Sequence, residues 1–443
     1  MIKLGVLFLG RKRPGFDPEW GKKITADVKD YLGKTDYEVF YPSVDVVDDL
    51  SLRKAVSECK SDEVDVLVLL QPTISDGNHS LTLSNLWPHP LVLWATPTRQ
   101  TGAVVASNSL VGTHIAASTL SHMNHPFEVV FGMPDEKGFE DKLHTAIRTT
   151  YAARKVKEAK VGLVGYQAPG YINVQADAVD LNNILGVQLY QTQIKDLLDA
   201  MDSVTEDEIK KDVETIMGFG FPLNDVTEEN LKVSAKYYIA LNRFMENESL
   251  DAIAVRCWPE LPNVTGQWPY LAFARMLTEG KAVGAEGDVD GALTCMIGNL
   301  LGFGAGYISD WLEHDSETIT TWHTGNTSFN FLEEPGSEHG PKIGRHFNNN
   351  KPVVVEGRLK PEKDITIFRL WRQGGSYRMA GFEGKTILPR RELMGTNGLS
   401  QINGLDPNDL FDELCHAGMP HHISLFPGHH AKTLHKFATL TNI

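Results

Sequence analysis

Short apolar runs separated by longer amphipathic stretches mark the first part of the chain. The runs at 4–9, 64–70, 91–95 and 104–106 have the hydrophobicity of buried parallel strands. Longer amphipathic stretches lie between them, as expected for helices that cover a sheet. This rhythm predicts a doubly wound α/β sheet.

A second set of elements follows a charged helix expected at 141–157. Residues 160–165 are typical of a new strand that leads into a glycine turn. Thr205 and Glu208 have the spacing of a capping box before a polar helix, 231–244 has a helical pattern, and 250–257 is typical of a buried strand. These elements predict a second α/β domain.

From about residue 307 the pattern changes to many glycines and prolines with alternating segments at 352–359, 365–371 and 377–382. Alternation of this kind indicates a third, mainly β domain. The expected architecture is therefore two Rossmann-like three-layer α/β domains at 1–157 and 158–304, followed by a mainly β C-terminal domain at 305–443.

Composition narrows the class of protein. A chain of 443 residues suits two or three domains, and 42 Lys and Arg against 57 Asp and Glu give a net charge of −15, which argues against nucleic acid. The apolar start is too short to span a bilayer and lacks a cleavage site, so we expect neither export nor a membrane partner. The four scattered cysteines favour a reducing compartment, and hence the cytoplasm.

Four acids are candidates for the chemistry, and the first of them lies where an open α/β sheet presents its ligands. Glu260 follows the predicted strand 250–257, and Glu286 lies just before a buried helix expected at 289–301. Glu286 and Asp288 could equally cap that helix and complement its dipole. Asp310 lies in an apolar stretch, where a carboxylate needs a partner.

Histidines add to this pattern near the C-terminus. His323 has small polar neighbours, and four of the 16 histidines lie between positions 421 and 430. A lone buried histidine is more often a hydrogen-bonded core residue, but clustering with isolated carboxylates favours a metal site. Oxygen-rich ligands with one imidazole suit Mn²⁺ or Mg²⁺ better than structural zinc.

Several motifs together resemble the superfamily of L-fucose isomerase and L-arabinose isomerase. They are Ala-Glu-Gly-Asp-Val-Asp-Gly-Ala-Leu-Thr at 285–294, Ser-Asp-Trp at 309–311, Met-Pro-His-His at 419–422 and an Arg-Pro segment at 13–14. The resemblance implies an aldose-ketose isomerase that uses a divalent cation, Mn²⁺ or another such as Mg²⁺ or Co²⁺, and no organic cofactor. It also implies a barrel-like C-terminal domain and a homohexamer whose sites are shared between subunits.

The resemblance also implies roles for particular residues. Glu286 and Asp310 match metal ligands that also form the acid/base pair, and His422 matches the third ligand. His323 matches a metal histidine of L-arabinose isomerase that L-fucose isomerase lacks, so its role stays open. Residues that we expect around the sugar are Arg11, Arg13, Trp258, Glu260, His323, His421 and His429.

The substrate hypothesis comes from the basic loop at 10–14, which carries three cations in an acidic protein. Arg11 and Lys12 could simply be solvated. Alternatively, they recognise an anionic tail on a hexose, such as the sulfonate of sulfoquinovose, which the enzyme would convert to its ketose. The alternative substrates are neutral sugars such as L-fucose, D-arabinose and L-arabinose.

Two other functional classes compete with the isomerase. A sugar receptor would also use a cleft between α/β domains, but it would need export and no carboxylate pair. A metal-dependent sugar aldolase or epimerase would use the same enediolate chemistry, and the sequence alone distinguishes it poorly from an isomerase.

Overall fold

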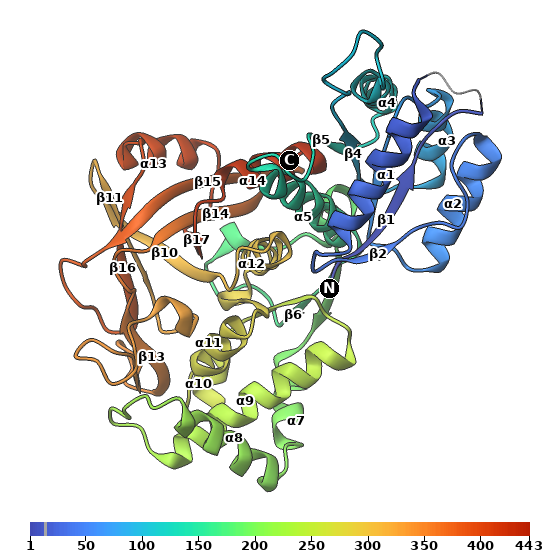
Figure 1. Ribbon diagram of the computed structural model, residues 1–443. Helices are drawn as coiled ribbons and strands as arrows, with labels where there is room; N and C mark the ends of the chain where they lie inside the picture. Colours follow the sequence, from blue (N-terminus) through green and yellow to red (C-terminus); the bar gives the residue numbers. More distant parts are fainter. Residues whose placement is uncertain (13–15) are drawn as a thin grey trace. The chain divides into compact units, whose positions relative to one another are not determined.

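A computed structural model describes residues 1–12 and 16–443 (Figure 1). They form two compact units, the first made of Met1–Lys155 with His435–Asn442 and the second of Val156–Leu434 with Ile443. The chain leaves the first unit within α5 (Phe139–Glu158) and returns to it within α14 (Ala431–Thr441). None of the described helices is both long and apolar enough to cross a bilayer.

The first unit is a parallel sheet with strand order β2-β1-β3-β4-β5. Leu4 and Val6 of β1 pack with α1 and α5, whereas Leu7 packs with α2, α3 and α4, so helices cover both faces (Figure 1). The predicted doubly wound α/β sheet is confirmed. The bounds of these strands and helices are β1 (Lys3–Phe8), β2 (Glu38–Phe40), β3 (Val66–Leu70), β4 (Leu91–Ala95), β5 (Phe127–Phe131), α1 (Pro18–Leu32), α2 (Asp49–Ser61), α3 (Asn78–Leu86) and α4 (Ser109–His122).

The strand predicted at 104–106 is wrong. Val104 and Val105 are exposed, at 74% and 55%, and this segment belongs to the connection between β4 and α4. The strand that follows β4 in the sheet is β5, whose side chains alternate between buried and exposed because it lies at the edge. The strand at the edge of the sheet is therefore marked by alternation, and not by a continuous apolar run such as 104–106.

The second unit begins with another parallel sheet, of order β7-β6-β8-β9. The capping box predicted at Thr205 and Glu208 is present at the start of α8. The elements are β6 (Lys160–Val164), η1 (Ile172–Val174), α6 (Ala178–Asp180), η2 (Leu181–Leu185), β7 (Gln188–Thr192), α7 (Ile194–Asp202), α8 (Glu206–Gly218), α9 (Glu228–Asn247), β8 (Ala252–Val255), α10 (Glu260–Val264), α11 (Tyr270–Thr278), β9 (Ala282–Gly284), η3 (Ala285–Gly287) and α12 (Val289–Leu301).

The rest of the second unit is antiparallel and closes into a barrel. Strands follow the order β11-β10-β17-β14-β15-β16, and β16 pairs back to β11 while β13 and β12 extend from β16. The elements are β10 (Tyr307–His314), β11 (Thr318–His323), η4 (Phe329–Phe331), β12 (Lys342–Arg345), β13 (Pro352–Arg358), β14 (Asp364–Gln373), β15 (Ser376–Ile387), β16 (Thr396–Ile402), α13 (Pro407–His416) and β17 (His422–Pro427). The expected barrel-like C-terminal fold is confirmed.

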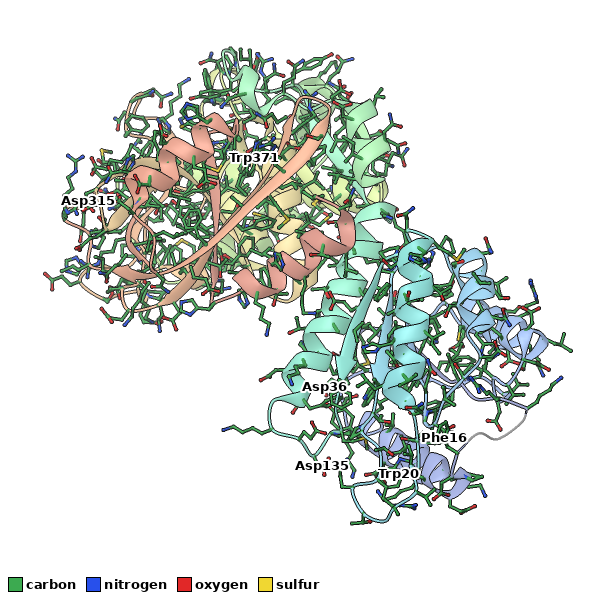
Figure 2. All side chains as sticks on the ribbon, turned by 90° about the horizontal axis from the view of Figure 1, so that it is seen from above. Phe16, Trp20, Asp36, Asp135, Asp315 and Trp371 are labelled. Carbon is green, nitrogen blue, oxygen red and sulfur yellow. The ribbon has the colours of Figure 1, made fainter. Side chains whose placement is uncertain are left out.

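Two labelled side chains of this barrel illustrate its construction (Figure 2). Trp371 of β14 is buried in the barrel's core, and its Nε1 donates to the carbonyl of Ala417 at 3.0 Å. Asp315 lies at the outer turn between β10 and β11, where its Oδ1 accepts the N–H groups of Glu317 and Thr318. The hydrophobic interior and the polar turn thus both follow the antiparallel pattern.

Helix α12 joins the parallel sheet to the barrel, because it packs against β9 on one side and against β14 and β17 on the other. A side chain at Gly298 would place its Cβ 2.1 Å from the ring of Phe426, so only glycine permits this approach. The division of the second unit into domains at 158–304 and 305–443 stays a prediction, as does the boundary at 157.

Candidate active site

Glu286 occupies the short turn between β9 and α12. Its φ of 61° and ψ of 15° lie in the left-handed region, which residues other than glycine rarely adopt. Its N–H donates to Sγ of Cys257 at 3.3 Å, and its carbonyl accepts the N–H of Ala168 at 2.8 Å. Strain of this kind costs about 1–3 kcal/mol and is concentrated at functional sites. The surrounding structure therefore holds this buried carboxylate in one place.

Asp310 and His422 are brought together by strand pairing. Asp310 of β10 lies directly opposite His422 of β17, so both side chains project from one face of the barrel sheet. Nε2 of His422 lies 3.7 Å from Oδ1 of Asp310 and 3.3 Å from Oε2 of Glu286. The three residues that the sequence singled out as catalytic or metal-binding thus lie side by side.

The imidazole of His422 is oriented by Asp288. Nδ1 of His422 donates to Oδ2 of Asp288 at 2.8 Å, which leaves Nε2 facing the carboxylates of Glu286 and Asp310. Arg369 of β14 donates to the same carboxylate from both Nη atoms, at 2.7 and 3.0 Å. Asp288 also caps α12 by accepting the N–H of Gly291, so the predicted cap is present alongside a second role.

The pKa values follow from this arrangement. Burial raises the pKa of Asp288, but the charge of Arg369 and the hydrogen bond from His422 outweigh it and hold that pKa well below its usual range. Burial also raises the pKa of Glu286, and the neighbouring imidazoles of His421 and His422 outweigh it. Burial lowers the pKa of His422, yet the neighbouring carboxylates of Asp288 and Glu286 raise it overall to about 10. Asp288 and Glu286 stay ionised, and their negative charge favours a proton, or a cation in its place, at Nε2 of His422.

A second histidine and two aromatic rings complete the surroundings of Glu286. Nε2 of His421 lies 3.7 Å from Oε2 of Glu286, and its Nδ1 lies 3.1 Å from the side-chain amide of Asn173. The ring of Tyr171 packs against His421 with a centroid distance of 5.1 Å. Nε1 of Trp258 donates to Oε1 of Glu286 at 3.2 Å, which leaves Oε2 for the imidazoles.

These side chains fit a divalent cation. Two sets have ligand atoms within 4.8 Å of one another, Glu286 with both His421 and His422, and Asp310 with both His323 and His422. Nε2 of His421 and Nε2 of His422 are buried and lack a hydrogen-bond partner among residues 1–12 and 16–443. Buried polar atoms are normally paired, so a cation between these groups would satisfy them. Carboxylate and imidazole donors suit Mn²⁺ and related ions.

Glu286 and Asp310 line a cavity of about 360 Å³ in the second unit. Pockets of this size take small organic ligands. Its aromatic lining includes Trp258, Trp268, Tyr270 and Trp322, and sugars stack readily on such apolar faces. The other lining residues are Tyr171, Pro259, Pro262, Asn263, His323, Thr324, His346, Phe347, Asn348 and Asn349.

Among the residues expected near the sugar, Glu260 and His429 lie outside this lining. Oε1 of Glu260 pairs with Arg256 at 2.5 Å at the start of α10. His429 lies beside β15, with Nε2 at 3.3 Å from the carbonyl of Gly384. By contrast Trp258 and His323 line the cavity, and His421 is in contact distance of Glu286.

The basic loop belongs to the first unit. Nε of Arg11 donates to the carbonyl of Ser75 at 3.0 Å, and Lys12 pairs with Asp48 at 2.5 Å. Arg13 lies outside the described residues. The role of these cations in binding a substrate stays a prediction.

Sequence reasoning missed Arg369 and most of the aromatic lining. Arg369 interrupts the apolar run 365–371, and a cation at a buried strand position was a signal that it needs a buried anion. His346 and the asparagines after it have the composition of an ordinary turn. Only the packing of that turn against α10 and Trp268 makes it part of the cavity.

Comparison with known proteins gives one family match and full-length relatives. The L-arabinose isomerase central domain family matches residues 172–304. The sulfoquinovose isomerase of Priestia megaterium is 25% identical over 441 residues, 99% of this chain and 98% of that protein. That of Alkalicoccus urumqiensis is 25% identical over 86% of this chain and 85% of its own. The L-arabinose isomerase of Thermotoga petrophila is 24% identical over 44% of this chain and 40% of its own.

Solved structures give only distant overlaps. A periplasmic solute binding protein from Actinobacillus succinogenes with bound D-allose is 11% identical, over 63% of this chain and 83% of its own, with a TM-score of 0.18. A superposition this poor carries no argument about fold or function.

Replacing Asp288 by Asn tests how His422 is oriented. The asparagine side chain is neutral, and its NH₂ group can face Nδ1 of His422, where the carboxylate now accepts a hydrogen bond. Both changes favour the tautomer of His422 with its proton on Nε2. We expect the affinity for Mn²⁺, measured by calorimetric titration of the metal-free protein, to fall by about 10- to 100-fold.

The control is Asp212→Asn. Asp212 accepts two hydrogen bonds from the buried Arg275, at 2.6 and 2.7 Å, and neither residue lines the cavity. This variant should lose stability without losing Mn²⁺ affinity. Wild-type Mn²⁺ affinity in a folded Asp288→Asn protein would contradict the assigned role.

Proposed function

We propose that this chain, which belongs to the superfamily of the L-arabinose and L-fucose isomerases, is an aldose-ketose isomerase that converts sulfoquinovose into its ketose. One observation carries the proposal. The unpaired Nε2 of the buried His422 lies within 3.7 Å of two carboxylates, Glu286 and Asp310, that line a cavity of sugar size. The sugar itself is proposed from relatives that align with nearly the whole chain.

We propose that Glu286, Asp310 and His422 hold Mn²⁺, or another divalent cation such as Mg²⁺ or Co²⁺. A cation held by these residues would act as a Lewis acid and stabilise the negative charge that develops on the sugar oxygens. The proposal is supported by oxygen and imidazole donors in two clusters that share His422, and by the two unpaired imidazole nitrogens. His323 lies in one of the two clusters and is a further candidate ligand.

Glu286 and Asp310 are the proposed acid/base pair. Isomerisation takes a proton from C2 of the open-chain aldose and delivers one to C1, while another proton moves from O2 to O1. Two carboxylates can divide these tasks between carbon and oxygen. Trp258, through its bond to Oε1, keeps the Glu286 carboxylate from rotating, so the base stays aligned with the carbon that it serves.

Assembly and compartment belong to the same proposal. We propose a homohexamer in which the basic loop of one subunit, with Arg11 and Arg13, approaches the cavity of another. All four cysteines are free thiols, which supports the cytoplasm as the compartment.

A substrate panel in heavy water tests the reaction. With Mn²⁺ present, sulfoquinovose should be turned over faster than glucose 6-phosphate, L-fucose, D-arabinose and L-arabinose at equal concentration. NMR should detect the ketose and deuterium gained at C2 of the recovered aldose, because the proton removed can exchange with solvent. Faster turnover of a neutral sugar would contradict the proposed substrate, and chain cleavage would indicate an aldolase.

Glu286→Gln tests the base. The change removes a negative charge and a basic oxygen at almost constant volume, so kcat should fall about 10²-fold or more in a folded protein. Glu260→Gln is the matched control, because Glu260 pairs with Arg256 outside the cavity lining, and it should keep most of the activity. Equal rates for wild type and Glu286→Gln in a steady-state assay would refute the role.

Light scattering of the purified protein tests the assembly. We expect particles of six chains, each of 49.1 kDa, since sites shared between subunits require association. A fully active monomer would rule out the shared site.

A further inference from the structure

The loop between β12 and β13, residues 346–351, forms a part of the cavity that the reaction chemistry does not use. His346, Asn348 and Asn349 of this loop line the cavity together with Asn263 at the end of α10. Among the described residues that line the cavity, none is Lys or Arg. A sugar with an anionic tail must therefore be recognised by other donors or by a cation from elsewhere.

A wall of aromatic rings leads from the carboxylates to this loop. The ring of His422 lies 5.5 Å from that of His323, which lies 6.2 Å from that of Tyr270. Tyr270 in turn lies 6.3 Å from His346, and Trp268 stacks on His346 at 4.0 Å. A hexose that reacts at C1 and C2 beside Glu286 would extend its C6 end along such a wall, away from the negative charges.

Asn349 presents a donor to the cavity. Its Oδ1 already accepts two hydrogen bonds, from Nε1 of Trp268 at 3.1 Å and from the N–H of Lys351 at 3.2 Å. An amide oxygen engaged twice in this way fixes the orientation of the group. The free atom of the Asn349 side chain is thus its NH₂.

Asn263 is arranged in the same way. Its Oδ1 accepts from Nζ of Lys351 at 3.3 Å, and Lys351 is anchored by a second bond, at 2.6 Å, to the carbonyl of Pro262. The amide NH₂ of Asn263 remains available. The ammonium of Lys351 adds positive potential behind Asn263 without lining the cavity itself.

His346 contributes a third donor. Its Nδ1 accepts the N–H of Asn348 at 3.4 Å, so in the neutral ring the proton is on Nε2. Burial and the nearby His323 lower the pKa of His346 to about 4, which keeps the ring neutral near neutral pH. On Asn263, His346 and Asn349 the acceptor atoms are thus engaged by the protein, and what remains on each of these side chains is N–H.

We propose that Asn263, His346 and Asn349 form a subsite for the sulfonate of the substrate, made of neutral hydrogen-bond donors backed by Lys351. The inference rests on the proposed function and names the groups that select its substrate. A sulfonate has acceptors only and satisfies every donor, whereas a hydroxyl both donates and accepts and a methyl group satisfies none.

Asn349→Asp is the sharpest test. The aspartate keeps an oxygen for Trp268 and Lys351, so the loop should fold, but it replaces the NH₂ donor by a negative charge. We expect KM for sulfoquinovose to rise about tenfold or more, because like charges face each other. KM for 6-deoxy-D-glucose, which differs only in lacking the sulfonate, should stay within about twofold of wild type, since it offers no group to the subsite.

A second variant and a matched control complete the experiment. Asn263→Asp should act as Asn349→Asp does. Asn350→Asp adds the same charge to the same loop at an exposed residue that does not line the cavity, and it should leave both KM values nearly unchanged. An effect on sulfoquinovose from Asn350→Asp as large as that from Asn349→Asp would overturn the subsite, because long-range charge would then explain it.

The outcomes separate this inference from the function on which it rests. Wild-type protein that isomerises neutral aldoses but not sulfoquinovose overturns the proposed substrate and the subsite together. Wild-type protein that prefers sulfoquinovose, with Asn349→Asp affecting both sugars alike, overturns only the subsite. Selective loss of sulfoquinovose turnover in Arg11→Ala but not in Asn349→Asp would assign the sulfonate to the basic loop instead.

Discussion

The buried ion pair between Arg369 and Asp288 stabilises the second unit and also fixes the position of a side chain in its candidate site. Both side chains are at most 1% exposed, so each charge would be costly without the other. The carboxylate accepts four hydrogen bonds, two from Arg369, one from His422 and one from the first turn of α12. A single group thus ties β14, β17 and α12 together at the point where the imidazole must be held.

This arrangement explains why the cluster can be both buried and highly charged. Asp288 is satisfied entirely by protein donors, while Glu286 and Asp310 face the cavity and the unpaired Nε2 of His422. The negative charge of Asp288 is neutralised behind the imidazole, whereas the carboxylates of Glu286 and Asp310 remain available to a cation. The left-handed backbone at Glu286 belongs to the same division, because it turns the chain from β9 into α12 within a few residues and leaves the carboxylate on the cavity side.

The cavity has a chemical gradient along its length. Carboxylates gather beside His422, and the loop after β12 offers amide and imidazole N–H groups backed by an ammonium. A polar substrate with different groups at its two ends can be bound in only one direction by such a lining, since reversal would set anion against anion and leave donors unpaired. Orientation of the sugar would then follow from hydrogen-bond polarity as well as from shape.

Local patterns determined the elements and the candidate residues. The buried helix expected at 289–301 is α12, and the cap at Asp288 is present. Glu286 and Asp310 stood out as isolated acids, and His422 stood out within the histidine cluster and by resemblance to a known family. Hydrophobic periodicity and caps act within a few residues, so a sequence displays them directly. Only the tertiary structure decided that Asp310 lies opposite His422, that Arg369 neutralises Asp288, and that an ordinary-looking asparagine turn lines the cavity. Those relations depend on strand register and barrel closure between distant segments, which no local pattern specifies.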